Sequence, residues 1–295
     1  QHYAVLCLEQ QVSPTPQECV PEGPVIIGAD GVGPAHRLVA KLSGGAYHPL
    51  ICHLIDVAAV AEAVWEECLA GPARRQLAES LELPHEATKC WIAFVAGAHD
   101  LGKATPVWQA KIWRARGAGD GRSAPPSLAG TSLDFKRLSS VADDPGHGVV
   151  TAAHLPRLLT SELGVTAPAA FRLALITGGH HGAFASPTER LRAQRAVGLG
   201  EVGNTGWAEA RLALGRELAR LLSLTGAPVE PSNATSMLLA GFVSVVDWIG
   251  SIDDERFFPY APDGAGDPEA YLGDRRRRAR RALSLLHWDA WASGA

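Results

Sequence analysis

Apolar residues recur at helical spacing along most of this chain. Between His53 and Leu69 they stand three and four residues apart, which predicts an α-helix with one face in a core. The apolar positions of this helix are Leu54, Val57, Val60, Ala61, Val64, Trp65 and Leu69. The segment from Lys89 to Ala98 is apolar nearly all round. Because a helix without a polar face must be enclosed on every side, this segment is predicted to be a central helix.

Further helices are predicted along the rest of the chain. Ser186-Pro187-Thr188-Glu189 is a capping box with proline at the first helical position, and Asp267-Pro268-Glu269 opens a last helix. Between residues 36 and 295 we find no convincing alternation of apolar and polar residues with a period of two, so the domain is predicted to be all-α. Helical spacing continues over residues 148–163, 167–177, 207–224 and 237–252.

Two segments depart from the helical pattern. Residues 1–34 hold short strand-like apolar pieces, Tyr3–Leu8 and Val25–Ile27, between prolines, and are interpreted as an irregular or strand-like N-terminal extension. Residues 117–130 are rich in Gly, Ser and Pro and are predicted to form a long surface loop. The predicted organisation is an extension over 1–34, a helical domain over 35–260 and a basic C-terminal helix within 261–295.

Composition narrows the class of protein. The chain has 295 residues, of which 46% are hydrophobic and 20% charged, as in an ordinary globular protein. A net charge of −4 gives no global attraction to nucleic acid, so such binding needs local patches or a metal. The five cysteines form no CxxC pair, which favours a reducing, cytoplasmic location. No segment has about 18 uninterrupted apolar residues and none resembles a signal peptide, so no membrane contact is expected.

Ionisable residues interrupt the apolar helices at several points. The apolar run from Phe94 ends in the sequence His99-Asp100-Leu101-Gly102-Lys103. Apolar helices seldom carry adjacent ionisable groups unless these are paired or hold a metal. Each group taken alone is explained as well by a structural role, but together the groups would need several independent explanations. The remaining candidate groups are His53, His147, His180, His181 and Asp247.

The residue types in this set indicate which ions they could hold. Imidazoles and carboxylates without a thiolate suit Mn, Fe, Co, Ni or Zn. Seven ligand groups are too many for one tetrahedral ion, whereas they suit two divalent transition-metal ions that share a carboxylate, the arrangement that cleaves phosphodiesters in two-metal enzymes. His48 and His154 are the nearest competitors for ligand roles, and we interpret both as structural.

Two other patterns could contact phosphate. Residues 97–103 match the spacing of a phosphate-binding P-loop as far as Lys103, but Ala104 replaces the hydroxyl residue that would hold magnesium, and the preceding run is helical. We therefore reject a P-loop. A basic run near the C-terminus could track a phosphate backbone, although we favour a solvated helix face or a face that docks onto another domain. This run comprises Arg275, Arg276, Arg277, Arg278, Arg280 and Arg281.

The order of the histidine and aspartate motifs resembles the HD superfamily of metal-dependent phosphohydrolases. More closely, the chain resembles the HD nuclease domain of the CRISPR-associated helicase–nuclease of type I systems, over roughly residues 36–255. The resemblance is specific because all the ligand motifs occur in order. The strings that carry it are His48-Pro-Leu-Ile-Cys-His53-Leu-Ile-Asp56, His99-Asp-Leu-Gly-Lys103-Ala-Thr-Pro, Gly179-His-His-Gly182 and Asp247-Trp-Ile-Gly-Ser251.

The resemblance implies a helical HD-domain bundle that binds two divalent metals and cuts single-stranded DNA. It implies a bridging role for Asp100 and a charge-stabilising role at the phosphate for Lys103. The other implied metal ligands are His53, His99, His147, His180, His181 and Asp247. Members of this family work beside a helicase and a target-bound CRISPR surveillance complex. Because these 295 residues hold no P-loop, the chain is expected to be a separate nuclease subunit or a piece cut before the helicase.

Two rival functions stay open at this point. An HD phosphohydrolase could act on nucleotides or cyclic nucleotides, although no base-reading signature is recognisable. A DNA-binding or adaptor module with an inactive HD site is the rival of another class, and the intact set of ligand positions argues against it.

Overall fold

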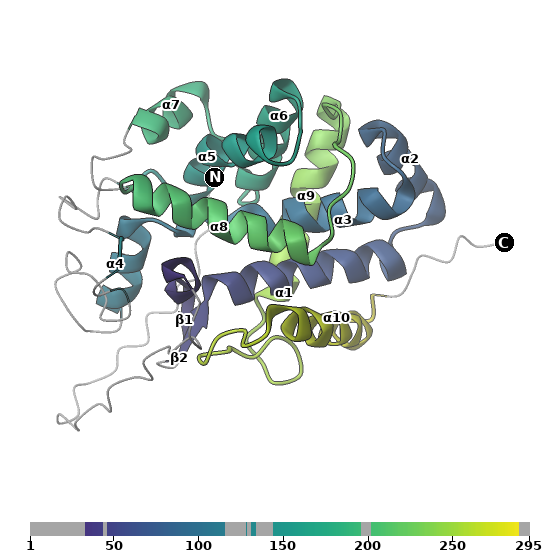
Figure 1. The fold of residues 1–295 in the computed structure, drawn as a ribbon. Coiled ribbons are helices and arrows are strands. Elements are labelled where there is room, and N and C mark those ends of the chain that lie inside the picture. Colours follow the sequence, from purple (N-terminus) through teal and green to yellow (C-terminus); the bar gives the residue numbers. More distant parts are fainter. Residues whose placement is uncertain are drawn as a thin grey trace, which may run out of the picture.

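The computed structural model describes residues 33–43, 46–115, 128, 131–133, 144–195 and 202–288. The predicted extension over residues 1–34 lies outside these ranges apart from Gly33 and Pro34, and the predicted loop over residues 117–130 lies outside them apart from Leu128. Within the described part of the chain, helices dominate and the strands form a single two-stranded sheet (Figure 1). The all-α prediction is confirmed.

The elements follow in a simple order. The first half holds the 3₁₀-helix η1 (Pro34–Arg37), β1 (Val39–Ser43), β2 (Ala46–Pro49), α1 (Leu50–Ala63), the π-helix η2 (Val64–Cys68), α2 (Gly71–Leu81), α3 (His85–Gly97), the 3₁₀-helix η3 (Ala98–Lys103) and α4 (Pro106–Ala115). The second half holds α5 (His147–Ser161), α6 (Ala167–Gly178), α7 (Pro187–Arg195), α8 (Thr205–Leu221), α9 (Asn233–Gly250) and α10 (Pro268–Leu285).

The hairpin corrects the expectation that residues 36–295 hold no strand. Strands β1 and β2 pair antiparallel, with Lys41 opposite His48 and an irregularity between Val39 and Lys41. Each strand has only four or five residues, and burial along β1 does not alternate, so the two-residue period that marks longer strands is absent. The dipeptide Gly44-Gly45 between the strands is a sequence signal for a hairpin, and it is independent of any two-residue period.

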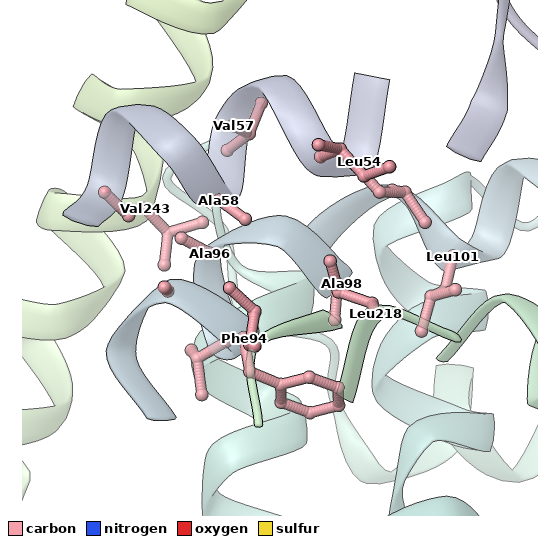
Figure 2. Close-up of a cluster of buried hydrophobic side chains, with 14 of the residues drawn as sticks. Leu54, Val57, Ala58, Phe94, Ala96, Ala98, Leu101, Leu218 and Val243 are labelled. Carbon is pink, nitrogen blue, oxygen red and sulfur yellow. The ribbon is translucent and has the colours of Figure 1, made fainter. Parts of the chain in front are cut away.

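Helix α1 occupies the centre of the bundle. Every one of its residues is buried, whereas α3 is fully enclosed only from Trp91 onward. The central helix is therefore α1, and the predicted central segment forms the second half of α3 packed against it (Figure 1). Figure 2 shows the shared core, to which α1, α3, η3, α8 and α9 all contribute. Its labelled side chains are Leu54, Val57, Ala58, Phe94, Ala96, Ala98, Leu101, Leu218 and Val243.

The capping box predicted at Ser186 is present at the start of α7. The backbone N–H of Ser186 donates to Glu189 Oε2 at 2.8 Å, and the N–H of Glu189 donates to Ser186 Oγ at 3.3 Å. These reciprocal bonds satisfy two backbone donors that the first turn of a helix leaves without partners.

Helix α9 is apolar enough to need an explanation. Among the described helices it alone has the length and composition that could cross a membrane, with 18 residues and a mean hydropathy of 1.2. It carries Asp247 in its interior and packs against α1, α3 and α6 through a buried stripe that includes Leu239, Val243 and Val246. A core position accounts for this stripe.

Helix α10 covers the polar side of α1. The buried Asp56 carboxylate accepts a hydrogen bond from Tyr271 at 3.1 Å and lies 3.4 Å from Arg275 Nε. Further along α1, Arg276 makes a two-pronged ion pair with Glu62 at 2.6 and 2.7 Å. The acidic groups of the central helix are therefore neutralised by the basic helix that closes over them.

We predict that Arg275→Ala lowers the free energy of unfolding by about 3–5 kcal/mol, because it leaves the buried Asp56 charge without its cationic partner. Arg277→Ala is the matched control: its side chain on the same helix is 72% exposed, so we expect a change within about 0.5 kcal/mol. Urea unfolding of both variants measures the difference. Equal effects would show that Arg275 does not hold α10 on α1.

Candidate metal centre

Five elements bring the seven predicted ligand residues to one place. His53 comes from the first turn of α1, and His99 and Asp100 come from η3 at the end of α3. His147 is the first residue of α5, and Asp247 lies near the end of α9. The remaining pair, His180 and His181, follows the end of α6. Helix ends thus supply most of these side chains, which lets imidazoles from separate parts of the sequence point at one carboxylate.

The Asp100 carboxylate stands at the middle of this cluster. Its Oδ2 atom lies 3.1 Å from His53 Nε2 and 3.2 Å from His99 Nε2. Its Oδ1 atom lies 3.2 Å from His147 Nε2 and 3.8 Å from His180 Nε2. The two oxygens therefore face two different pairs of imidazoles.

Asp247 and His181 complete the two sides. Asp247 Oδ1 lies 3.4 Å from His53 Nε2 and 3.3 Å from His99 Nε2, on the Oδ2 side of Asp100. His181 Nε2 lies 2.9 Å from His147 Nε2, on the Oδ1 side. Within the described residues, three groups have ligand atoms within 4.8 Å of one another: His53, His99 and Asp100; His147, His180 and His181; and His99, His180 and Asp247, which joins the two sides.

The backbone sets the orientation of two imidazoles. His99 Nδ1 lies 2.9 Å from the carbonyl oxygen of Ala96, and His180 Nδ1 lies 3.0 Å from that of Thr177. Since a carbonyl can only accept, Nδ1 carries a proton in both rings, and Nε2 is the ring nitrogen that faces the centre. Metal-binding histidines are held in this way in known sites.

Several buried polar atoms at the centre have no hydrogen-bond partner. They are the Nε2 atoms of His53, His99 and His180 and the Oδ1 atom of Asp100. Buried polar groups without partners are rare in folded proteins, and an ion is one of the few explanations for several that converge. The donor set of imidazole nitrogen and carboxylate oxygen also suits a divalent transition metal. The residues present therefore fit the two implied ions.

Burial and neighbouring charges shift the pKa values of the titratable groups at the centre. Burial opposes ionisation of Asp100, but His99, Lys103 and His147 hold the pKa of this carboxyl well below its usual range. Burial lowers the pKa of His147 to about 4 and that of His180 to about 3, so both rings are neutral at pH 7. Burial also works against a charge on His99, yet Asp100 and Asp247 raise its pKa to about 9.

Lys103 lies beside the Asp100 carboxylate, and its predicted role at a phosphate stays a prediction. Its Nζ atom lies 2.6 Å from Asp100 Oδ2 and 4.6 Å from the ring centre of Trp108. The Trp108 ring in turn packs edge-on against His147, with ring centres 5.1 Å apart. Trp108 forms a wall of the centre that the sequence analysis did not identify.

Lys41 is a second residue near the centre that the sequence analysis did not identify. This residue of β1 hydrogen-bonds to Ser251 Oγ, and its Nζ atom lies 4.0 Å from Asp247 Oδ1. Burial lowers the pKa of Lys41 from its ordinary value, and the Asp247 carboxylate opposes that effect.

The two histidines interpreted as structural lie outside the ligand groups. His48 Nε2 lies 2.8 Å from Asp56 Oδ2, and its Nδ1 accepts from the backbone N–H of Ala261 at 3.3 Å. His154 lies on α5, where burial lowers its pKa to about 3.

The arginine run lies on α10, where most of its charge is already paired. In addition to the contacts of Arg275 and Arg276 with α1, Arg280 lies 2.9 Å from Glu66 of η2, and Arg277 and Arg278 both contact Asp274. Arg281 is exposed. These ion pairs favour the packing interpretation, and nucleic-acid binding by the run stays a prediction.

Gly102 allows η3 to approach α5 closely. A Cβ atom at this position would lie 1.9 Å from the carbonyl oxygen of His147. The N–H of Gly102 donates to Thr151 Oγ1 at 2.9 Å, and that hydroxyl donates to the carbonyl of His99 at 2.9 Å. The glycine therefore sets the spacing between the two elements that carry His99, Asp100 and His147.

We predict that Gly102→Ala weakens Mn²⁺ binding by at least about tenfold, because the added methyl group pushes His147 away from Asp100. Gly273→Ala on α10 is the control, since a Cβ there meets nothing within 4 Å. Calorimetric titration with Mn²⁺, together with the thermal midpoint of each variant, measures the effect. Wild-type Mn²⁺ affinity in Gly102→Ala would contradict this account of the spacing.

Comparison with known proteins assigns the fold and its centre to a family. The model of the Cas3 HD domain family matches residues 39–258. The CRISPR-associated endonuclease/helicase Cas3 of Thermus thermophilus is 38% identical over 259 residues, covering 85% of this chain and 25% of the relative. This chain thus spans about a quarter of the length of that relative.

Comparison with solved structures supports the same family. The crystal structure of the Thermus thermophilus Cas3 HD domain in the presence of Ni²⁺ matches with a TM-score of 0.61 and 33% identity, covering 89% of this chain and 95% of that one. A chain in the structure of a CRISPR RNA-guided surveillance complex in a pre-nicking state matches with a TM-score of 0.65 and 28% identity, covering 85% and 29%. The motif resemblance is confirmed: the chain belongs to the Cas3 HD domain family.

Proposed function

We propose that this chain is a metal-dependent nuclease that hydrolyses phosphodiester bonds of single-stranded DNA in type I CRISPR interference, in the cytoplasm. The observation that carries the proposal is the Asp100 carboxylate, whose two oxygens face two separate pairs of imidazoles. A shared carboxylate between two ligand groups is the arrangement expected for a pair of ions about 3.5–4 Å apart.

The ligand residues divide between two ion positions. His53, His99 and Asp247 would hold one ion together with the Asp100 carboxylate, which would also contribute to the other ion. The remaining ligands of the second ion would be His147, His180 and His181. When bound, two divalent ions such as Mn, Fe, Co or Ni supply an activated water and stabilise charge on the attacking and leaving oxygens.

The protein's own part in the reaction is positioning and electrostatics. The backbone carbonyls of Ala96 and Thr177 fix two imidazoles, so little reorganisation is needed when a substrate arrives. Lys103 keeps its ammonium beside Asp100, where it would offset charge on the non-bridging oxygens of a phosphate. No protein nucleophile is required.

The proposed partners of this chain are inferred from the proteins that it resembles. The Thermus thermophilus relative is named an endonuclease/helicase and is about four times as long as the part matched here. We propose that this domain works with a helicase domain or subunit that delivers single-stranded DNA. The match to a chain of a surveillance complex supports recruitment to such a complex.

We predict that the wild-type protein nicks circular single-stranded DNA in the presence of Mn²⁺, Co²⁺ or Ni²⁺, and that EDTA abolishes the nicking. Asp100→Ala should reduce the rate by more than about 100-fold, because it removes the shared ligand and not merely an outer-shell support. Gel analysis of the cleavage products over time measures the rate.

Asp263→Ala, which removes an exposed carboxylate, is the control and should nick at the wild-type rate. Undiminished nicking by Asp100→Ala would refute the proposed mechanism. Phosphate release from small nucleotides without DNA cleavage would favour the nucleotide phosphohydrolase, and elemental analysis that finds no bound metal would favour an inactive adaptor.

A further inference from the structure

A second lysine, Lys41, stands at the edge of the metal centre beside Asp247. Lys41 Nζ donates to Ser251 Oγ, and this hydroxyl donates to Asp247 Oδ1 at 2.8 Å. The ammonium itself lies 4.0 Å from the same carboxylate oxygen. Since Lys103 pairs with Asp100, each of the two carboxylates at the centre has its own lysine.

The position of Lys41 is fixed by buried contacts of its strand. The side-chain amide of Gln109 bonds to the backbone of Val39 in both directions, accepting from its N–H at 3.0 Å and donating to its carbonyl at 2.9 Å. The same amide donates to the carbonyl of Lys103 at 3.1 Å. One buried glutamine thus ties the strand that carries Lys41 to the end of the 3₁₀-helix η3, which carries Lys103.

The two lysines differ in their access to solvent. The Lys41 side chain is 22% exposed, whereas that of Lys103 is 7% exposed and lies against Asp100 and Trp108. Lys41 can therefore reach a molecule that approaches from solvent without any change in the packing of the bundle.

The ammonium of Lys41 offers a positive charge to an anion at the edge of the centre. A cation next to Asp247 repels a metal ion and competes with it for the carboxylate, so Lys41 does not assist metal binding. Once divalent ions bind to Asp247, the ammonium loses much of its attraction to that carboxylate and becomes available to another negative group. The substrate of the proposed function is a polyanion with one charge per phosphate.

We propose that Lys41 is a phosphate-binding residue of this site, which contacts the backbone of the single-stranded DNA on the Asp247 side of the centre. The inference rests on the proposed nuclease function and adds a substrate-contacting residue to it. A structural role makes the opposite prediction, since a lysine that merely holds Asp247 and Ser251 in place would strengthen metal binding.

Three variants separate these roles. Lys41→Gln removes the charge and keeps a polar side chain near Ser251, and Lys41→Arg keeps the charge. Lys89→Gln is the matched control, because Lys89 is 18% exposed and likewise pairs with a carboxylate, that of Glu66 at 3.1 Å. For each protein we would measure Mn²⁺ affinity by calorimetry, binding of inorganic phosphate to the Mn²⁺-loaded protein, and the salt dependence of kcat/KM for single-stranded DNA.

We expect Lys41→Gln to bind Mn²⁺ as tightly as the wild type or more tightly, and to bind phosphate more weakly. Its kcat/KM should fall by about 10–100-fold. Removal of a buried hydrogen-bond donor to a transition state costs about 100–1,000-fold in rate, so the expected effect is smaller or similar. The slope of log kcat/KM against log salt should become shallower by about 0.7, the contribution of one phosphate contact on a single strand. Lys41→Arg should restore most of the activity, and Lys89→Gln should match the wild type.

Weaker Mn²⁺ binding in Lys41→Gln, in proportion to its loss of activity, would overturn the inference in favour of a structural role. Wild-type phosphate binding in this variant would overturn it as well. If the wild-type protein does not cleave DNA, the proposed function fails, and the phosphate titration still decides whether Lys41 binds an anion.

Discussion

The structure depends on the burial of one carboxylate, that of Asp100, in the middle of an apolar helical bundle. Only 1% of this residue is exposed, and an isolated charge at such a depth would be prohibitively unfavourable. The ammonium of Lys103 in the same 3₁₀-helix, and the imidazoles of His53 and His147 from α1 and α5, make the position tolerable. The chemistry of the centre therefore helps to fix several elements relative to one another, as the hydrophobic core also does. These are the ends of α3, α6 and α9 and the start of α5.

Burial of charge also explains the outer parts of the fold. Because α1 is enclosed along its whole length, Asp56 and Glu62 need cationic partners, and α10 supplies them as Arg275 and Arg276. The basic run on α10, which could be interpreted as a binding site for nucleic acid, thus forms ion pairs with the protein's own acidic side chains. The positive charge closest to the proposed reaction comes instead from two lysines, Lys41 and Lys103, at the centre itself.

The clustering of the seven candidate side chains could be predicted from the sequence because each is a local anomaly, an ionisable residue at the end of or within an apolar helix. The helices of the core followed from spacing for the same reason. Lys41, Gln109 and Trp108 could not be found in this way, since their importance depends on contacts across long stretches of chain: Gln109 and Val39, for example, are 70 positions apart. The partner of Arg276 is 214 positions away, so spacing along α10 could not distinguish a paired arginine from a free one. The hairpin was missed because its strands are too short for a period, although Gly44-Gly45 marked the turn in the sequence.

The pairing of one lysine with each carboxylate has a consequence for the order of events. In the protein alone, the carboxylates of Asp100 and Asp247 offset the charges of Lys103 and Lys41, and His99, whose pKa is raised to about 9, adds one further positive charge at pH 7. Each divalent ion would add two positive charges, and Gln109 would still hold β1 and the end of η3 in place, because its bonds to the backbone do not involve the carboxylates. The attraction of the centre for a polyanion would therefore rise with metal loading. The proposed nuclease would then bind the phosphate of its substrate most firmly once its ions are in place.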